Sequence, residues 1–111
     1  MWVFNLDGFF SAVEHRDKPE CVTVRARYKE DLEQLKVKIC CSLAVEETPD
    51  ADYPYRLTID KLRWSKYLAK EALDINYDNF KKASLKDADV ERIEQYHDVW
   101  ASMAGFGRMG L

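Results

Sequence analysis

The chain has 111 residues, and its 17 basic and 20 acidic side chains give a formal net charge of −3 at pH 7. With 47% hydrophobic and 33% charged residues, the composition predicts one small, well-solvated domain and excludes a multidomain architecture. No apolar run reaches the roughly 18 residues of a membrane-spanning helix, and the first residues lack the basic flank and long apolar stretch that are typical of a signal peptide. We therefore expect a cytoplasmic protein without a membrane partner.

The first 27 residues are typical of β structure, because short aromatic and β-branched runs are separated by turn residues. Trp2–Asn5 and Phe9–His15 are predicted as strands joined by a tight turn at Asp7-Gly8, since glycine tolerates positive φ. Cys21–Arg27 alternates with a period of two, which predicts a half-buried strand. Its apolar face carries Val22, Val24 and Ala26, and its polar face carries Thr23, Arg25 and Arg27.

From Lys29 onward the apolar period becomes helical, with Leu32, Leu35 and Ile39 on one side of a first helix. The stretch Glu46–Asp52 is acidic and contains proline, so we expect a mobile surface loop. Residues 53–60 alternate again and are predicted as a fourth strand, which carries Tyr53, Tyr55 and Arg56.

Three further helices are predicted in the second half of the chain. Asp60 is expected to cap a helix over Lys61–Asp74, on which Leu62, Ala69 and Leu73 recur at near-helical spacing beside Trp64 and Leu68. Asn76 or Asp78 is expected to cap a short helix through Phe80–Leu85, and Asp87 or Asp89 to cap the last one.

The order of these elements, β-β-β-α-β-α-α-α, predicts an α+β fold: a mostly antiparallel four-stranded sheet with helices packed on one face. We expect a single domain over residues 1–104. Residues 105–111 hold three of the four glycines of the chain and are predicted as a flexible C-terminal tail.

Arginines on two strands give the main functional hypothesis. Arg25 and Arg27 share the polar face of one strand, and Arg56 lies on the polar face of another, so neighbouring strands would bring three guanidinium groups together. Such groups suit phosphate or carboxylate, and nearby tyrosines can add stacking. The predicted binding residues are Arg25, Arg27, Arg56, Tyr28, Tyr53 and Tyr55. The alternative is that the arginines pair with local carboxylates such as Glu14 and Glu20.

A second basic strip supports a nucleic-acid role only weakly. Lys61, Arg63, Lys66 and Lys70, followed by Lys81 and Lys82, could track a phosphate backbone. Acidic residues intervene, however, and a charge-rich helix face is usually a solvated face.

Metal and catalytic motifs are absent from the sequence. The candidate metal ligands have none of the usual spacings, so we expect no metal and no cofactor. These candidates are His15, Cys21, Cys40, Cys41 and His97. We expect the cysteines to be reduced thiols. Since there is also no nucleophile elbow, phosphate loop or dinucleotide fingerprint, the protein is predicted not to be an enzyme. A small enzyme that uses His97 with Asp98 or a cysteine is kept as an alternative.

Several separated motifs over residues 1–104 together resemble a family of small, stand-alone, uncharacterised bacterial proteins. The motifs are Gly8-Phe9-Phe10-Ser11-Ala12-Val13, Val24-Arg25-Ala26-Arg27, Asp52-Tyr53-Pro54-Tyr55-Arg56, Tyr77-Asp78-Asn79-Phe80-Lys81 and the pair Val99-Trp100 three residues after Tyr96. The resemblance implies no reaction, cofactor or catalytic residue. The chain departs from the pattern at Asn5-Leu6-Asp7, where a turn with proline is usual.

The sequence thus predicts a small non-enzymatic binding module that recognises an anionic group on a protein or nucleotide partner. An alternative is an acidic inhibitor or adaptor, such as one from a mobile element, whose loop Glu46–Asp52 mimics phosphate charge and occupies a basic groove of a nucleic-acid-handling protein. Trp2 and Phe4 on the N-terminal edge strand could also form a homodimer.

Overall fold

The computed structural model describes residues 1–107, whose contacts form two compact units. Unit 1 comprises Met1–Asn76 and unit 2 begins at Tyr77. The division into one domain over 1–104 and a tail over 105–111 stays a prediction, and residues 108–111 of that tail lie outside the described part of the chain.

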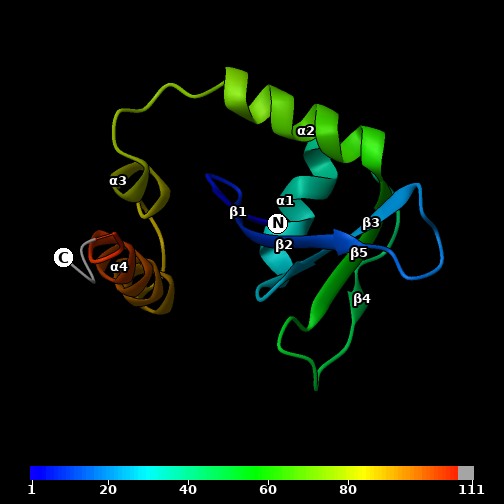
Figure 1. Ribbon diagram of the computed structural model, residues 1–111, viewed down its shortest axis with the longest axis horizontal. Helices are drawn as coiled ribbons and strands as arrows, with labels where there is room; N and C mark the ends of the chain where they lie inside the picture. Colours follow the sequence, from blue (N-terminus) through cyan, green and yellow to red (C-terminus); the bar gives the residue numbers. More distant parts are fainter. Residues whose placement is uncertain (108–111) are drawn as a thin grey trace. The chain divides into compact units, whose positions relative to one another are not determined.

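Unit 1 contains an antiparallel sheet whose strands lie in the order β1-β2-β3-β5-β4 (Figure 1). The strands are β1 (Trp2–Asn5), β2 (Gly8–Glu14), β3 (Cys21–Ala26), β4 (Glu46–Glu47) and β5 (Tyr55–Asp60). The predicted α+β class is confirmed, but the described sheet has five strands rather than four. The additional strand, β4, comes from the stretch predicted as a loop. Backbone pairing at a sheet edge needs no apolar side chain, so two exposed glutamates can form it.

The turn between β1 and β2 comes one residue earlier than predicted. Leu6 and Asp7 form the loop between the paired residues Asn5 and Gly8. The Asn5 side-chain oxygen holds this turn by accepting from the backbone N–H of Asp7 at 3.0 Å and of Gly8 at 3.2 Å. Gly8 has a φ of 143°, and a Cβ there would collide with the carboxylate of Asp31. Position 8 therefore requires glycine.

Residues 1–107 contain four helices, and in three of them the side chain of the preceding residue caps the first turn. Their bounds are α1 (Lys29–Lys38), α2 (Lys61–Leu73), α3 (Phe80–Ser84) and α4 (Val90–Ala104). Asp60, Asn79 and Asp89 accept hydrogen bonds at the starts of α2, α3 and α4. Asp60 and Asp89 are among the predicted caps, whereas Asn79 replaces the predicted Asn76 or Asp78. Over residues 1–107 no helix has both the length and the apolar character to cross a membrane.

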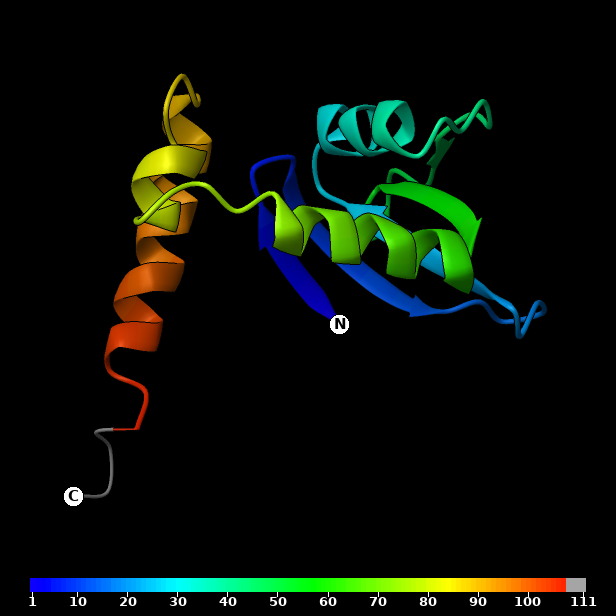
Figure 2. The same ribbon diagram turned by 90° about the horizontal axis from the view of Figure 1, so that it is seen from above.

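The core of unit 1 lies between one face of the sheet and the helices α1 and α2 (Figure 2). It is formed by Phe10, Ala12, Val24, Ala26, Leu57 and Ile59 from the strands and Leu32, Leu35, Trp64 and Tyr67 from the helices. The predicted apolar face of α2 is partly wrong, because Leu62 and Leu73 are 63% and 85% exposed. Trp64 and Tyr67 are buried instead, since two aromatic rings one turn apart cover more of the sheet than leucines do.

Candidate functional site

The second face of the sheet, opposite the one packed on α1 and α2, carries the predicted arginines. Side chains alternate along a strand, so Arg25 points away from the face that holds its neighbours Val24 and Ala26 in the core. Arg56, next to the buried Leu57, does the same on β5. We call the following group the arginine face: Ser11, Arg25, Arg27, Tyr53 and Arg56.

Two of the three arginines are direct cross-strand neighbours. Arg25 of β3 lies opposite Arg56 of β5, and on its other side it lies opposite Ser11 of β2. Directly opposite residues of an antiparallel pair have Cβ atoms about 5 Å apart. The antiparallel pairing of β3 with β5 therefore brings together residues that are far apart in the sequence.

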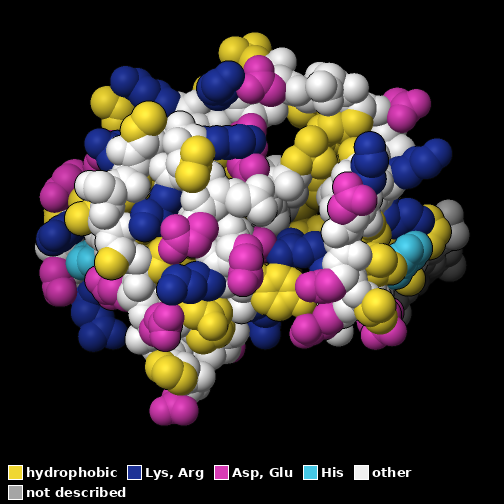
Figure 3. Space-filling model, turned by 180° about the vertical axis from the view of Figure 1, so that it is seen from behind, with side chains coloured by type: hydrophobic (Ala, Val, Ile, Leu, Met, Phe, Trp, Pro, Cys, Tyr) yellow, Lys and Arg dark blue, Asp and Glu magenta, His cyan; other side chains and the backbone are white. Residues whose placement is uncertain are grey.

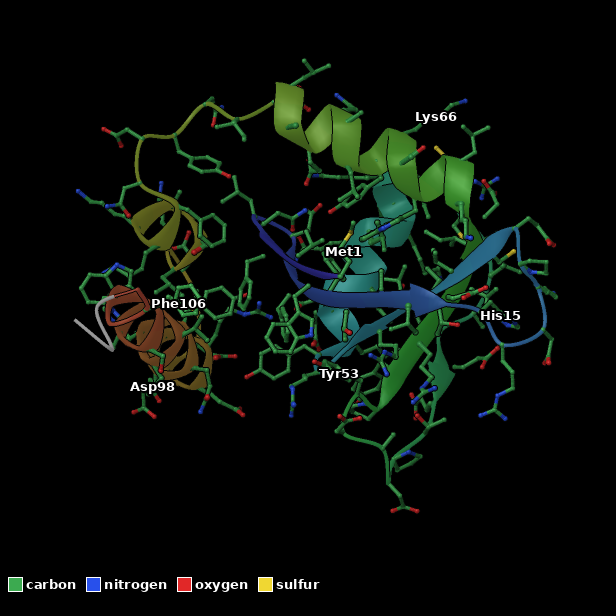
Figure 4. All side chains as sticks on the ribbon, in the orientation of Figure 1. Met1, His15, Tyr53, Lys66, Asp98 and Phe106 are labelled. Atoms are coloured by element: carbon green, nitrogen blue, oxygen red, sulfur yellow. The ribbon has the colours of Figure 1, made fainter. Side chains whose placement is uncertain are left out.

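Tyr53 contacts both Arg25 and Arg27 and so places Arg27 beside the Arg25–Arg56 pair. The guanidinium carbon of Arg25 lies 4.6 Å from the centre of the Tyr53 ring, and that of Arg27 lies 5.0 Å from it. Tyr53 is only 6% exposed, so both cations stack on a buried aromatic residue. Arg25 is fixed further by a hydrogen bond that its Nη2 donates to Ser11 Oγ at 2.8 Å. In Figure 4, Tyr53 and Lys66 of α2 lie on opposite sides of β2.

Tyr55 does not join the arginine face, and Tyr28 lies at the start of α1. Tyr55 is opposite Ala26 in the sheet and packs against the core, so the structure does not bring it to the arginines. Tyr53 and Tyr55 separate because Tyr53 precedes β5 and does not follow the alternation of the strand. Tyr28 is the residue before α1, and its backbone carbonyl accepts from the N–H of Asp31 at 3.3 Å.

Within the described residues, the arginines of the arginine face form no ion pairs. Within residues 1–107 no carboxylate lies at ion-pair distance from Arg25, Arg27 or Arg56, so the alternative of pairing with Glu14 or Glu20 is not seen. The Nε atoms of Arg25 and Arg56 are shielded from solvent and have no hydrogen-bond partner in this part of the chain. Like charges directly opposite each other destabilise a sheet, and unsatisfied donors add to that cost.

An aromatic strip, formed by Trp2, Phe4 and Phe9, adjoins the arginine face on the same side of the sheet. The rings of Phe4 and Phe9 stack with centroids 4.4 Å apart, and Trp2 meets Phe9 edge-on at 6.1 Å. Phe9 in turn lies 6.1 Å from Tyr53. Ring contacts thus run without interruption from the edge strand β1 to the ring that holds the guanidinium groups of Arg25 and Arg27.

A partly buried polar cluster joins the β1–β2 turn to both helices of unit 1, and the sequence analysis did not predict it. Lys38 Nζ lies 3.0 Å from Asp7 Oδ2 and 3.2 Å from Glu71 Oε1. The Tyr67 hydroxyl donates to Asp7 Oδ2 at 2.6 Å, and Asn5 Nδ2 donates to Tyr67 Oη at 2.7 Å and to Glu71 at 3.1 Å. Asp7 is only 5% exposed. We call Asn5, Asp7, Lys38, Tyr67 and Glu71 the polar cluster.

Burial and charge shift the titration of this cluster. Burial raises the pKa of Tyr67 above 10.0, and its hydrogen bond to Asp7 raises it further. Burial and the neighbouring Asp7 also raise the pKa of Glu71, although Lys38 opposes this. For Lys38, burial lowers the pKa, but its contacts with Asp7 and Glu71 outweigh this, so the pKa lies above its ordinary value near 10.5.

His97 lines a basic hollow in unit 2. This hollow has a volume of about 630 Å³ and is lined by Asn79, Lys81, Lys82, Leu85, Lys86, Ile93 and His97. The ammonium group of Lys81 also lies 4.2 Å from the centre of the Trp100 ring. His97 is exposed and, within the described residues, forms no hydrogen bond to Asp98. The alternative of an enzyme that uses His97 stays a prediction.

Other predicted charged groups are partly neutralised locally. On α2, Arg63 pairs with Asp60 at 3.7 Å and Lys70 with Asp74 at 2.9 Å, as on an ordinary solvated helix face. Lys29 of α1 pairs with Glu47 of the acidic stretch at 3.6 Å. Among the residues from 1 to 107, no three His, Cys, Asp or Glu side chains are grouped so as to hold a metal ion.

Comparison of the chain with models of protein families, with curated proteins and with solved structures found no match. The resemblance to the family of small bacterial proteins stays a prediction. A function for this chain must therefore be argued from the geometry and charge of its own residues.

Proposed function

We propose that the protein is a small non-enzymatic binding module that recognises an anionic group of a protein or nucleotide partner through its arginine face. One observation carries the proposal: Arg25 and Arg56 lie opposite each other, with Arg27 nearby on the Tyr53 ring, and no carboxylate of the described chain, including Glu46 opposite Arg56, lies at ion-pair distance from them.

A bound anion would relieve the repulsion between these cations. Guanidinium groups bind phosphate and carboxylate through two parallel hydrogen bonds, which are stronger than hydrogen bonds between neutral groups. Tyr53 and Ser11 hold Arg25 in one orientation before any ligand arrives. Less conformational entropy is then lost on binding, which favours affinity.

The proposal is tested by titrating the protein with inorganic phosphate while the Nε–Hε signals of its arginines are followed by NMR. We expect saturable shifts of the Arg25 and Arg56 signals. The double variant Arg25→Ala/Arg56→Ala should bind at least about tenfold more weakly, since a hydrogen bond to a charged group contributes about 1.5–3 kcal/mol.

The matched control is the double variant Arg16→Ala/Arg63→Ala, which removes the same charge from a loop and from α2. It should bind phosphate nearly as the natural protein does. If both double variants lose affinity equally, binding follows net charge and the arginine face is not the site.

A further inference from the structure

We infer that the anionic ligand is a mononucleotide, whose phosphate binds the arginine face while its base stacks on the aromatic strip. This inference rests on the proposed function and narrows it to one ligand class. The arginine face alone is sufficient to bind an anion such as phosphate, so the aromatic strip beside it would have no role if phosphate were the whole ligand. A nucleotide contains both a flat aromatic ring and a phosphate, and so matches both halves of the surface.

The exposed indole of Trp2 is the stacking group. Trp2 is 72% exposed although it is the largest side chain on the strip, and its edge contacts Phe9, which orients the ring. Base stacking on aromatic side chains tolerates all bases, because every base has a π-face. Trp2 thus offers a platform for a base with no requirement for hydrogen bonds to it.

The spacing between the two halves suits one nucleotide. Trp2 lies opposite Ser11, and Ser11 lies opposite Arg25, so two strand spacings separate the backbone positions of Trp2 and Arg25. Adjacent strands lie about 4.8 Å apart, which gives about 10 Å between the Cα atoms of Trp2 and Arg25. A base, its sugar and its phosphate can bridge such a span. Phosphoserine and phosphothreonine carry no aromatic ring, and in phosphotyrosine a single oxygen atom joins the ring to the phosphate, so its reach is shorter than that of a nucleotide.

Charge favours a mononucleotide over a long nucleic acid. Beyond Arg56 the same row of the sheet ends at Glu46, which would repel a second phosphate group placed there. The net charge is −3, and Figure 3 shows acidic and basic side chains interspersed on the face it presents. A polyanion gains affinity from an extended basic surface, whereas one nucleotide needs only the local cations.

Calorimetry with adenosine 5′-monophosphate, ribose 5-phosphate, adenosine and a short single-stranded oligonucleotide tests this inference. We expect the mononucleotide to bind at least tenfold more tightly than ribose 5-phosphate and more tightly than adenosine. Trp2→Ala should reduce the affinity for the mononucleotide about tenfold and leave that for ribose 5-phosphate unchanged. The control Trp100→Ala, which removes a similarly exposed indole of unit 2, should change neither.

Each contrary outcome has a distinct meaning. Equal binding of the mononucleotide and ribose 5-phosphate by the natural protein would overturn the inference and leave the proposed function standing. If no phosphate compound binds, inorganic phosphate included, both the inference and the proposed function are overturned. Tighter binding of the oligonucleotide, or of a phosphotyrosine peptide added as a further ligand, would reject the mononucleotide as the ligand.

Discussion

Within the described residues, charged side chains form ion pairs in the polar cluster but not on the arginine face, although both regions lie in unit 1. In the polar cluster, Lys38 lies between the carboxylates of Asp7 and Glu71. On the arginine face, Arg25 and Arg56 lie opposite each other in the sheet, and no carboxylate of the described chain lies at ion-pair distance from either.

The paired charges serve stability, and we propose that the unpaired ones serve binding. The polar cluster satisfies its hydrogen bonds internally and ties the β1–β2 turn to α1 and α2, so it stabilises the fold. The arginine face gains little stability from its cations, since like charges repel and two Nε donors lack partners. We therefore expect substitutions to affect stability at the first region and binding at the second.

The largest loss of stability is expected for Asp7→Ala. This change leaves the buried hydroxyl of Tyr67 without its acceptor and removes one of the two carboxylates that contact Lys38. Because Asp7 is buried, the free energy of unfolding should fall by about 2–3 kcal/mol, measured by urea denaturation followed by circular dichroism. Asp50→Ala, at an exposed loop position, is the control. A loss no larger than in the control would show that the polar cluster does not stabilise the fold.

A smaller effect is expected from alkaline pH. The pKa values of Tyr67 and Lys38 are raised in the folded state, so both groups keep their protons while those of the unfolded chain are lost. Their contribution to stability is complete below pH 10 and decreases as the pH rises above about 10 for Tyr67 and 10.5 for Lys38. The ionisation of buried Tyr67 lowers the unfolding free energy by up to about 1.4 kcal/mol per pH unit in that range. The effect of Lys38 is smaller, because its side chain is 44% exposed and solvent screens its charge.

Urea denaturation at pH 9 and pH 11 measures this effect. Tyr67→Phe keeps an aromatic ring beside Trp64 but cannot ionise, so its stability should fall less between the two pH values than that of the natural protein. Tyr77→Phe, which leaves the polar cluster intact, is the control. An equal fall in all three proteins would exclude Tyr67 as a source of the pH dependence.

The smallest effect on stability is expected at the arginine face. Arg56 lies between Arg25 and Glu46 in the sheet, so Arg56→Gln removes a repulsion and an attraction together, and the unfolding free energy should change by less than about 0.5 kcal/mol in either direction. Lys66→Gln on α2 is the matched control for removing one positive charge. If the unfolding free energy falls by more than about 1 kcal/mol, Arg56 has a structural role. The arginine face would then stabilise the fold as the polar cluster does.

The arginine face could be predicted in part from the sequence because strand alternation assigns residues to faces. The period of two over Cys21–Arg27 predicts that Arg25 and Arg27 share a face, and the structure confirms the strand. The pairing of β3 with β5, which places Arg56 beside Arg25, needs the tertiary fold. Tyr53 and Tyr55 follow the same alternation in the sequence, but β5 begins only at Tyr55, so their separation could not be read from the pattern.

The polar cluster and β4 were missed for physical reasons. Each polar residue of the cluster is typical of a protein surface when it is seen alone, and the cluster forms only when the turn meets both helices. One signal was present: Glu71 follows Trp64 and Tyr67 at helical spacing, so it lies on the buried stripe of α2. Side-chain patterns cannot reveal β4, because its pairing with β5 is made by the backbone alone.

The short strand β4 also bears on self-association of the protein. Unpaired strand edges can template aggregation, and very short edge strands with charged side chains are a known protection against it. At this edge the sheet ends after two residues, both exposed glutamates, so an approaching copy would meet negative charge and little free backbone. The same two residues that add a fifth strand therefore also discourage fibril growth from that side of the sheet.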